Sequence, residues 1–260
     1  MPVLAHLSDL HFGRTDAAVV EALLDDLTQA RPDLVVISGD LTQRARSSQF
    51  AEARAFLDRL PAPALVVPGN HDLAPLHSPL NRLFRPRAKF HRHLAGHAER
   101  QIWQDNQVVV VGLDSTRHLR WTSGKLRSSH LDRIDTVLAG AEDSACKVAF
   151  LHHPPATALS GHPFEVLADR GIDLVLAGHV HKVRVELIAG AHHSSCILAQ
   201  ASTACSTRLR DEANGYGLIH IAMPDMVIEM RGWTGHAFHT VRRQAFHKSG
   251  SHWRHGPHLA

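Results

Sequence analysis

The sequence predicts an α/β protein in which two β-sheets pack face to face with helices on the outside. Short, continuous apolar runs indicate strands that are buried on both faces. Amphipathic segments between these runs indicate surface helices. After residue 180, helical patterns give way to consecutive strands with short turns. A chain of 260 residues, 44% hydrophobic and 20% charged, is long enough to form one such core.

Strands and helices are expected to alternate along the first 180 residues, which predicts parallel pairing. The expected strands are VLAHL (3–7), DLVVIS (33–38), ALVV (64–67), QVVVVGL (107–113), KVAFL (147–151) and DLVLA (173–177). The expected helices span residues 16–30, 47–60 and 128–141. Four later segments, VRVELIAG, SSCILAQAS, YGLIHIAM and MVIEMRGW, predict a second, largely antiparallel sheet.

Two segments have an unusual composition. Residues 77–100 are basic, and we expect a helical insertion with a solvated face, although a substrate contact or a homodimer contact is an alternative. Residues 244–260 are polar and rich in histidine, and we expect this tail to be disordered. Residues 1–243 are then expected to form a single domain.

Charge and cysteine content narrow the function classes. The net charge of +3 is too weak to argue by itself for nucleic acid as a partner. Three cysteines without CxxC spacing argue against a disulfide framework. The first apolar run is too short for a signal peptide, and no run approaches the roughly 18 apolar residues of a membrane span. These features predict a cytoplasmic protein.

Five of the expected strands end in side chains that bind divalent metals. They are Asp9 and His11 in SDLHFG, Asp40 in SGDLTQR, Asn70, His71 and Asp72 in PGNHD, His152 and His153 in HHPP, and His179 and His181 in GHVH. In an open parallel sheet, ligands bind beyond the carboxyl ends of the strands. We therefore expect these side chains to converge although they are far apart in the sequence.

Carboxylate and imidazole donors suit borderline divalent ions such as manganese, iron or zinc. Seven or eight donors are too many for one ion and fit two, and the lack of thiolates argues against a structural zinc site. A carboxylate can bridge two ions, whereas an imidazole cannot. Asp40, alone at its strand end, is the expected bridge.

The order Asp-x-His, Gly-Asp, Gly-Asn-His-Asp, His-His-Pro, Gly-His-x-His over residues 3–182 resembles the calcineurin-like metallophosphoesterase superfamily. The resemblance implies a four-layer αββα sandwich of two mixed β-sheets and a dinuclear metal site. It assigns Asp9, His11, Asp40 and His181 to one metal, and Asp40, Asn70, His152 and His179 to the other. It gives His71 a catalytic role, stabilising charge on the phosphate or protonating the leaving oxygen.

Three further residues are expected near this site in supporting roles. Asp72 would orient its neighbours or cap a turn. His153 is the alternative to His152 as a ligand, and strand geometry favours His152. Asp114 ends the strand at 107–113 and would support the site or its own turn.

The motifs GDLTQ, PGNHD and HHPP resemble those of class III cyclic nucleotide phosphodiesterases and of related glycerophosphodiesterases. They imply hydrolysis of a small phosphodiester, a cyclic nucleotide first, by attack of a metal-bridging hydroxide. UDP-diacylglucosamine pyrophosphatases are an alternative, although they usually carry arginine in place of His71. DNA-repair nucleases usually have His-Gln in place of His152 and His153. Non-enzymatic scaffolds tend to lose metal ligands, and all are present here.

Overall fold

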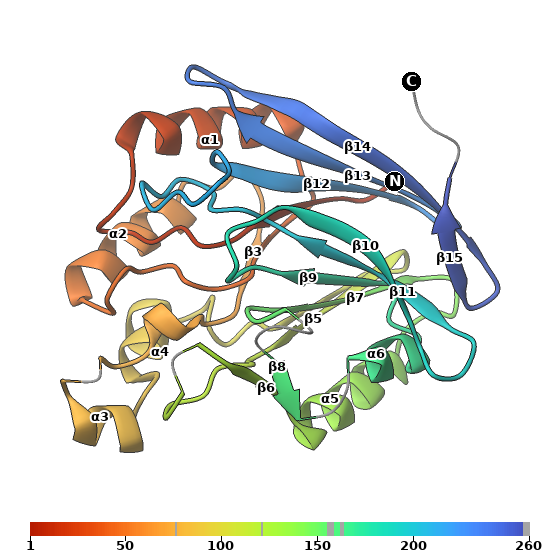
Figure 1. Cartoon of the computed structure of the whole chain (residues 1–260), viewed down its shortest axis with the longest axis horizontal. Coiled ribbons are helices and arrows are strands. Elements are labelled where there is room, and N and C mark those ends of the chain that lie inside the picture. Colours follow the sequence, from red (N-terminus) through yellow and green to blue (C-terminus); the bar gives the residue numbers. More distant parts are fainter. Residues whose placement is uncertain (76, 121, 155–158, 162–163, 257–260) are drawn as a thin grey trace.

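The structure is a computed structural model that describes residues 1–75, 77–120, 122–154, 159–161 and 164–256. Two large β-sheets pack face to face, and helices cover their outer faces (Figure 1). The expected four-layer α/β architecture is confirmed. Three hydrophobic cores hold the layers together, one between the sheets and one under each helical layer.

The first sheet has the order β15–β14–β13–β12–β1–β2–β3. Its strands are β1 (Val3–Leu7), β2 (Leu34–Ile37), β3 (Ala64–Val66), β12 (Gly215–Ala222), β13 (Asp225–Trp233), β14 (Phe238–Ser249) and β15 (His252–His255). Strands β1, β2 and β3 pair in parallel, whereas β12 pairs antiparallel with β1. The sheet is therefore mixed, and its parallel half carries three of the metal-type motifs.

The second sheet has the order β10–β11–β9–β7–β5–β4. Its strands are β4 (Ile102–Gln104), β5 (Val108–Leu113), β7 (Cys146–Leu151), β9 (Leu174–Ala177), β10 (Arg184–Ala189) and β11 (Ser195–Gln200). Neighbours β5, β7, β9 and β11 are all parallel. A small separate sheet joins β6 (Gly124–Leu126) to β8 (Leu159–Gly161) in parallel.

The expectation of a separate antiparallel sheet after residue 180 is wrong. Strands β10 and β11 extend the second sheet, and β12 to β15 extend the first. Each large sheet combines strands from both parts of the chain, because the open edges of β1 and β9 pair with the later strands β12 and β11.

The expectation of a disordered tail from residue 244 is also wrong for the residues that the structure describes. Residues 244–249 belong to β14 and residues 252–255 to β15, so the domain extends past residue 243. Phe246 and Trp253 are buried, and the indole nitrogen of Trp253 donates to Asp173 at 3.0 Å. These two apolar side chains, together with backbone pairing of β14 to β13 and β15, anchor the polar segment to the sheet. Residues 257–260 lie outside the described residues.

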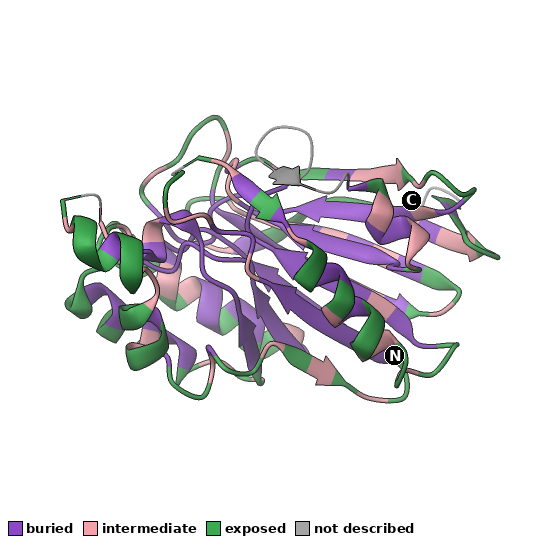
Figure 2. Cartoon of the chain, turned by 90° about the horizontal axis from the view of Figure 1, so that it is seen from below, coloured by how far each residue is buried: buried purple, intermediate pink, exposed green. Residues whose placement is uncertain are grey.

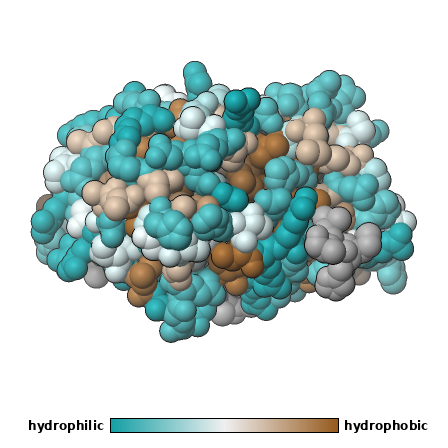
Figure 3. Space-filling model, turned by 90° about the horizontal axis from the view of Figure 1, so that it is seen from above, coloured by the Kyte–Doolittle hydropathy of each residue, from teal (hydrophilic) through white to brown (hydrophobic). Residues whose placement is uncertain are grey.

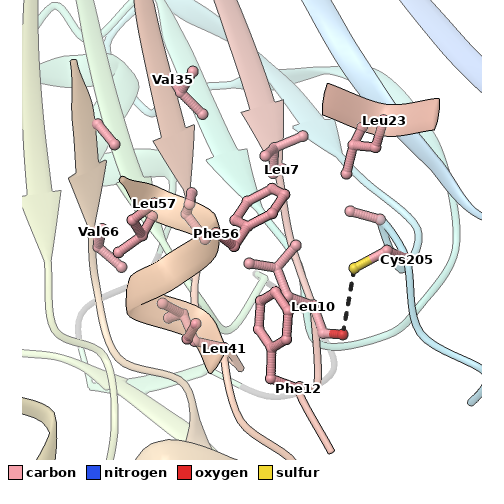
Figure 4. Packing of buried hydrophobic residues seen from close by; sticks show 14 of the residues in the cluster. Leu7, Leu10, Phe12, Leu23, Val35, Leu41, Phe56, Leu57, Val66 and Cys205 are labelled. Atoms are coloured by element: carbon pink, nitrogen blue, oxygen red, sulfur yellow. Dashed lines mark hydrogen bonds between the residues drawn. The ribbon is translucent and has the colours of Figure 1, made fainter. Parts of the chain in front are cut away.

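The main helices occur where the sequence predicts them. They are α1 (Ala17–Ala30), α2 (Ser47–Leu57) and α5 (Ser128–Leu138). A further short helix, α6 (Glu165–Asp169), lies where the sequence analysis expects none. Helix α1 begins where the Asp16 carboxylate accepts from the amide of Ala18 at 2.9 Å, a normal N-cap bond. Figure 4 shows Leu23 of α1 and Phe56 and Leu57 of α2 packed toward the strand residues Leu7, Val35 and Val66. Figure 2 shows that burial is concentrated in the strands.

The basic segment contains two short helices, α3 (Pro79–Phe84) and α4 (Ala88–His93), at one end of the molecule (Figure 1). Arg85, Lys89 and Arg92 are exposed as expected, but Arg82 is buried. Its guanidinium donates to the carbonyl groups of His118 at 2.5 Å and Ala74 at 2.8 Å. Hydrophilic residues dominate the face shown in Figure 3. Among the described helices, none has the length and apolar character needed to cross a membrane.

Candidate metal centre

The metal-type residues lie at the carboxyl ends of parallel strands from both sheets. Strands β1, β2 and β3 deliver Asp9 and His11, then Asp40, then the 3-10 turn Asn70–Asp72. Strands β7 and β9 deliver the His152–His153 pair and the His179–His181 pair. The two sheets therefore present their donors to one another across the same edge of the sandwich.

The backbone at these strand ends is unusual. Five of the residues have a positive φ angle: Asp9 (52°), His11 (52°), Asp40 (54°), His179 (70°) and His181 (57°). Asp and His tolerate this left-handed region better than β-branched residues, but each such position carries a conformational cost. Strained backbone of this kind clusters at functional sites, where the surrounding structure holds it in place.

One group of donors joins Asp9, His11 and His181, all of which are buried. Oδ1 of Asp9 lies 3.1 Å from Nε2 of His181 and 3.7 Å from Nε2 of His11. The two Nε2 atoms lie 3.2 Å apart. Nδ1 of His181 is 3.3 Å from the carbonyl of Arg208, and this contact orients the ring with Nε2 toward Asp9.

A second group joins Asn70, His152 and His179. Oδ1 of Asn70 lies 3.1 Å from Nε2 of His152 and 3.1 Å from Nδ1 of His179. Those two nitrogens lie 3.2 Å apart. Nδ1 of His152 donates to the carbonyl of Ser38 at 2.8 Å, which leaves Nε2 facing the other two donors.

Asp40 lies between the two groups. Its Oδ2 is 3.8 Å from Nε2 of His11 and 3.4 Å from Nε2 of His152. Its Oδ1 accepts from the backbone amide of His71 at 2.8 Å. A single carboxylate oxygen therefore faces both groups, while the other is held by the polypeptide.

These donors fit divalent metal ions. Bonds of about 2.0–2.2 Å to one ion place neighbouring donor atoms about 3 Å apart, as observed within both groups. Oδ1 of Asp9 is also buried without a well-aligned hydrogen bond from the described residues. A buried carboxylate oxygen in this state is costly unless a cation compensates it. The set holds carboxylate, amide and imidazole donors without thiolate, which suits a borderline divalent ion.

The electrostatics of the groups are those of a site prepared for cations. Burial opposes ionisation of Asp9 and Asp40, but His181 and His152 respectively hold the pKa of each carboxyl below its usual range. Burial alone would lower the pKa of His152, yet the adjacent carboxylates raise it to about 9. Burial lowers the pKa of His11 to about 4. His11 is therefore neutral near pH 7 and can bind a cation directly, whereas His152 releases a proton when a cation binds.

Two glycines allow this close packing. A Cβ added to Gly69 would collide with the carboxylate and backbone of Asp40. A Cβ added to Gly178 would lie 2.5 Å from Oδ2 of Asp9 and would collide with the Ser8 hydroxyl. Any larger residue at either position would push a carboxylate out of the centre.

The three supporting residues of the sequence prediction lie in different surroundings. The Asp72 carboxylate accepts from the amides of Leu41, Thr42 and Gly69, so it joins the loops after β2 and β3. Burial and the charge of Asp40 raise the pKa of Asp72 to about 7, against the effect of these hydrogen bonds.

His153 and Asp114 lie to one side of the donor groups. His153 bonds through Nδ1 to the Ser115 hydroxyl at 2.9 Å, and its ring centroid lies 4.6 Å from that of His179. Its donor atoms also lie within 4.8 Å of those of His152 and His179. Asp114 instead accepts from the amide and hydroxyl of Thr116 and forms an ion pair with Arg87.

His71 lies at the open side of the centre, half-buried, with its ring centroid 4.9 Å from that of His11. Its Nδ1 donates to the carbonyl of Gln43 at 2.7 Å, and Arg208 donates to Nε2 at 3.2 Å. Arg208 lies outside the motifs that indicate the site in the sequence. It follows β11, and because β11 is parallel to β9 its carboxyl end meets the same edge. Recognising β11 as a parallel strand would have indicated this residue.

Residues 2–183 match the calcineurin-like phosphoesterase family, which is 182 of the 260 residues of the chain. The chain belongs to this family. By membership of this family it is a phosphoric ester hydrolase, as the motif order implies. All side chains of the two donor groups lie within the matched residues, whereas Arg208, whose carbonyl orients His181, lies after them.

Relatives and solved structures agree with this membership. The chain is 28% identical over 261 aligned positions to a cAMP/cGMP dual specificity phosphodiesterase of Mycobacterium tuberculosis, covering 87% of this chain and 77% of that protein. It is 30% identical over 214 positions to a glycerophosphodiester phosphodiesterase of Enterobacter lignolyticus, covering 70% and 71%. The fold resembles that of a purple acid phosphatase from yellow lupin seeds, with a TM-score of 0.67 at 13% identity. That likeness covers 92% of this chain and about half, 52%, of the phosphatase.

Proposed function

We propose that the chain is a dinuclear metal-dependent phosphodiesterase that hydrolyses a small phosphodiester, with a cyclic nucleotide as the first candidate. The position of Asp40 carries this proposal. Its Oδ2 faces His11 on one side and His152 on the other, which is the arrangement that a carboxylate bridging two ions requires.

The ligand assignment follows the two groups of donors. Asp9, His11 and His181 would hold one ion, and Asn70, His152 and His179 the other, with Asp40 shared. When bound, a pair of divalent ions supplies a hydroxide nucleophile at neutral pH and polarises the phosphoryl oxygens. The protein residues fix the donor geometry through the carbonyls of Ser38 and Arg208, so little reorganisation is needed when the site is loaded.

His71 would act on the substrate rather than on a metal. The Gln43 carbonyl holds the proton of Nδ1, so Nε2 is the atom that would exchange a proton with the leaving oxygen, once the substrate takes the place of the Arg208 hydrogen bond to Nε2. The backbone amide of His71 is bound to Asp40, which ties the position of this ring to the bridging carboxylate.

Similarity to the named relatives supports the choice of substrate. The mycobacterial relative is named for cyclic nucleotides, and its alignment spans most of this chain. The enterobacterial relative is named for glycerophosphodiesters at slightly higher identity over a shorter alignment, which makes that class the second candidate.

The test is a comparison of esters with the purified chain loaded with Mn²⁺. We expect bis(p-nitrophenyl) phosphate to be hydrolysed faster than p-nitrophenyl phosphate. Cyclic AMP and glycerophosphocholine then separate the two substrate classes by their kcat/KM values. Preference for the monoester would contradict a phosphodiesterase, and absence of turnover with two bound ions would contradict a hydrolase.

A further inference from the structure

Two cavities share Gln43, Arg44 and Arg46 in their walls, and the first of them is lined by His71. One, of about 520 Å³, is lined in addition by His71 and Lys89. The other, of about 570 Å³, is lined in addition by Arg14, Gln49 and Arg208. Four arginine side chains therefore line the second cavity, close to the proposed metal centre.

These arginines lack acidic partners among the described residues. Within the described residues, no ion pair involves Arg14, Arg44, Arg46 or Arg208, and no carboxylate lines the cavity. Elsewhere on the surface, arginines such as Arg59 and Arg231 do pair with carboxylates, here Glu21 and Asp26. A concave surface with one sign of charge concentrates anions.

The polypeptide holds this wall in place. The carbonyl of Arg14 accepts from the amide of Thr207 at 2.7 Å, which joins the loop after β1 to the loop that carries Arg208. Oε1 of Gln49 accepts from the backbone amides of Arg44 and Arg46 at 2.9 and 3.3 Å. The backbone is therefore fixed, while the side chains of Arg14, Arg44 and Arg46 are exposed and available to a ligand.

We propose that this arginine-lined cavity binds a second phosphate group of the substrate, one that is not the phosphate being hydrolysed. The inference rests on the proposed function and changes its order of substrates: a phosphodiester that carries another phosphate should be preferred to a cyclic mononucleotide or to glycerophosphocholine, which carry only one. Arg208 lies at the junction, since its guanidinium is 3.2 Å from Nε2 of His71.

The scissile phosphate alone does not account for four arginines. Bound at the metal centre, it would already be neutralised by divalent cations and would lie beside His71 and Arg208. Arg14, Arg44 and Arg46 line the cavity that extends from that point. Guanidinium groups bind phosphate through paired hydrogen bonds, so their clustering selects phosphate over neutral substituents. A cyclic mononucleotide has a single phosphate and leaves this cavity without a ligand.

The experiment compares two chromogenic esters that differ by one phosphate. They are thymidine 5′-(p-nitrophenyl phosphate) and the same ester with a 3′-phosphate, assayed with the Mn²⁺-loaded full chain at low ionic strength. We expect kcat/KM to be about tenfold higher or more for the 3′-phosphorylated ester, because loss of one charge-assisted contact costs roughly tenfold in binding. In the double variant Arg14→Ala/Arg44→Ala the ratio should fall to near one.

Arg254→Ala, an exposed arginine on β15, is the matched control and should keep the wild-type ratio. Equal use of both esters by the wild-type chain, or a ratio that survives in the double variant, would overturn the inference and leave the phosphodiesterase function intact.

Direct binding decides the question independently of turnover. Titration calorimetry with thymidine 3′,5′-bisphosphate should give a Kd at least tenfold weaker for the double variant than for the wild-type chain. An equal Kd for the two proteins would overturn the cavity assignment, whether or not the esters are hydrolysed. Absence of hydrolysis would instead contradict the proposed function.

Discussion

Asp72 accepts two hydrogen bonds from Thr42, one from its amide at 2.8 Å and one from its hydroxyl at 2.9 Å. With the amides of Leu41 and Gly69, four donors converge on this buried carboxylate. The loops after β2 and β3 carry Asp40 and Asn70, so Asp72 fixes the distance between the proposed bridge and a ligand of the second ion.

Replacing Asp72 by Asn tests this connection. The amide nitrogen of Asn cannot accept from the converging donors, so we expect a loss of about 3 kcal/mol in the free energy of unfolding, the scale for a broken buried network. Urea unfolding of the metal-free protein measures it. Asp225→Asn at an exposed position is the control. A change below about 0.5 kcal/mol at Asp72 would show that the loops are held by other contacts.

His71→Ala separates catalysis from metal binding. Because His71 faces the substrate side and is not among the donors of either group, kcat should fall by about two orders of magnitude, the usual scale for a general acid. Metal content, measured by plasma mass spectrometry, should stay the same. His239→Ala on the exposed face of β14 should change neither quantity. Unaltered turnover in His71→Ala would remove the proposed acid.

Asp40→Ala tests the bridge. Since one oxygen of Asp40 faces both groups, its removal should lower occupancy at both positions together. The metal-to-protein ratio, about two in the wild-type chain by hypothesis, should fall well below one at micromolar free metal. By contrast, Asn70→Ala removes a donor from one group only. This variant should therefore keep the ion held by Asp9, His11 and His181 and lose mainly the other one. A full pair in Asp40→Ala would rule out bridging.

His6 makes stability depend on pH. Burial lowers its pKa to about 3, although Asp9 opposes this, and its ring bonds to the Ser38 hydroxyl. The native ring stays neutral while the unfolded chain takes up a proton below its ordinary pKa of about 6.5. Stability is therefore lost as pH falls from 6.5 toward 3.

The corresponding variant is His6→Asn, which keeps a polar group beside Ser38 and cannot titrate. Between pH 7 and pH 5.5 the metal-free wild-type chain should lose about 1 kcal/mol more unfolding free energy than the variant does. Urea unfolding at both pH values provides the comparison. Parallel losses in the two proteins would mean that the native His6 ring takes up a proton like an exposed histidine.

Local sequence was sufficient to locate the side chains that converge at the proposed metal centre. Asp9, Asp40 and His152 each follow a short apolar run, and parallel strands must bring such ends to a common edge. Helices α1 and α5 were equally predictable, because their apolar residues recur on one face of the helix. The spacing of Phe50, Ala53 and Leu57 also indicated α2, although its amphipathic pattern is weaker.

Features that depend on pairing between distant segments were not predictable in this way. The β11 segment looked like part of an antiparallel series, but its neighbour β9 pairs with it in parallel and brings Arg208 to the centre. Composition suggested a disordered tail, because two apolar residues, Phe246 and Trp253, were outweighed by polar ones. Nor does a basic segment reveal that Arg82 has carbonyl partners as far away as His118.

The position of β12 has a consequence for how the chain is made. It lies beside β1 in the first sheet, pairing Val3 with His220, although more than 200 residues separate them. During synthesis, β1 and the ligands that follow it leave the ribosome long before this neighbour exists. A fragment that ends at residue 183 would contain all seven proposed ligands and still expose one edge of β1. Such a fragment would be prone to associate through that edge, so the catalytic segment depends on the later strands to remain monodisperse.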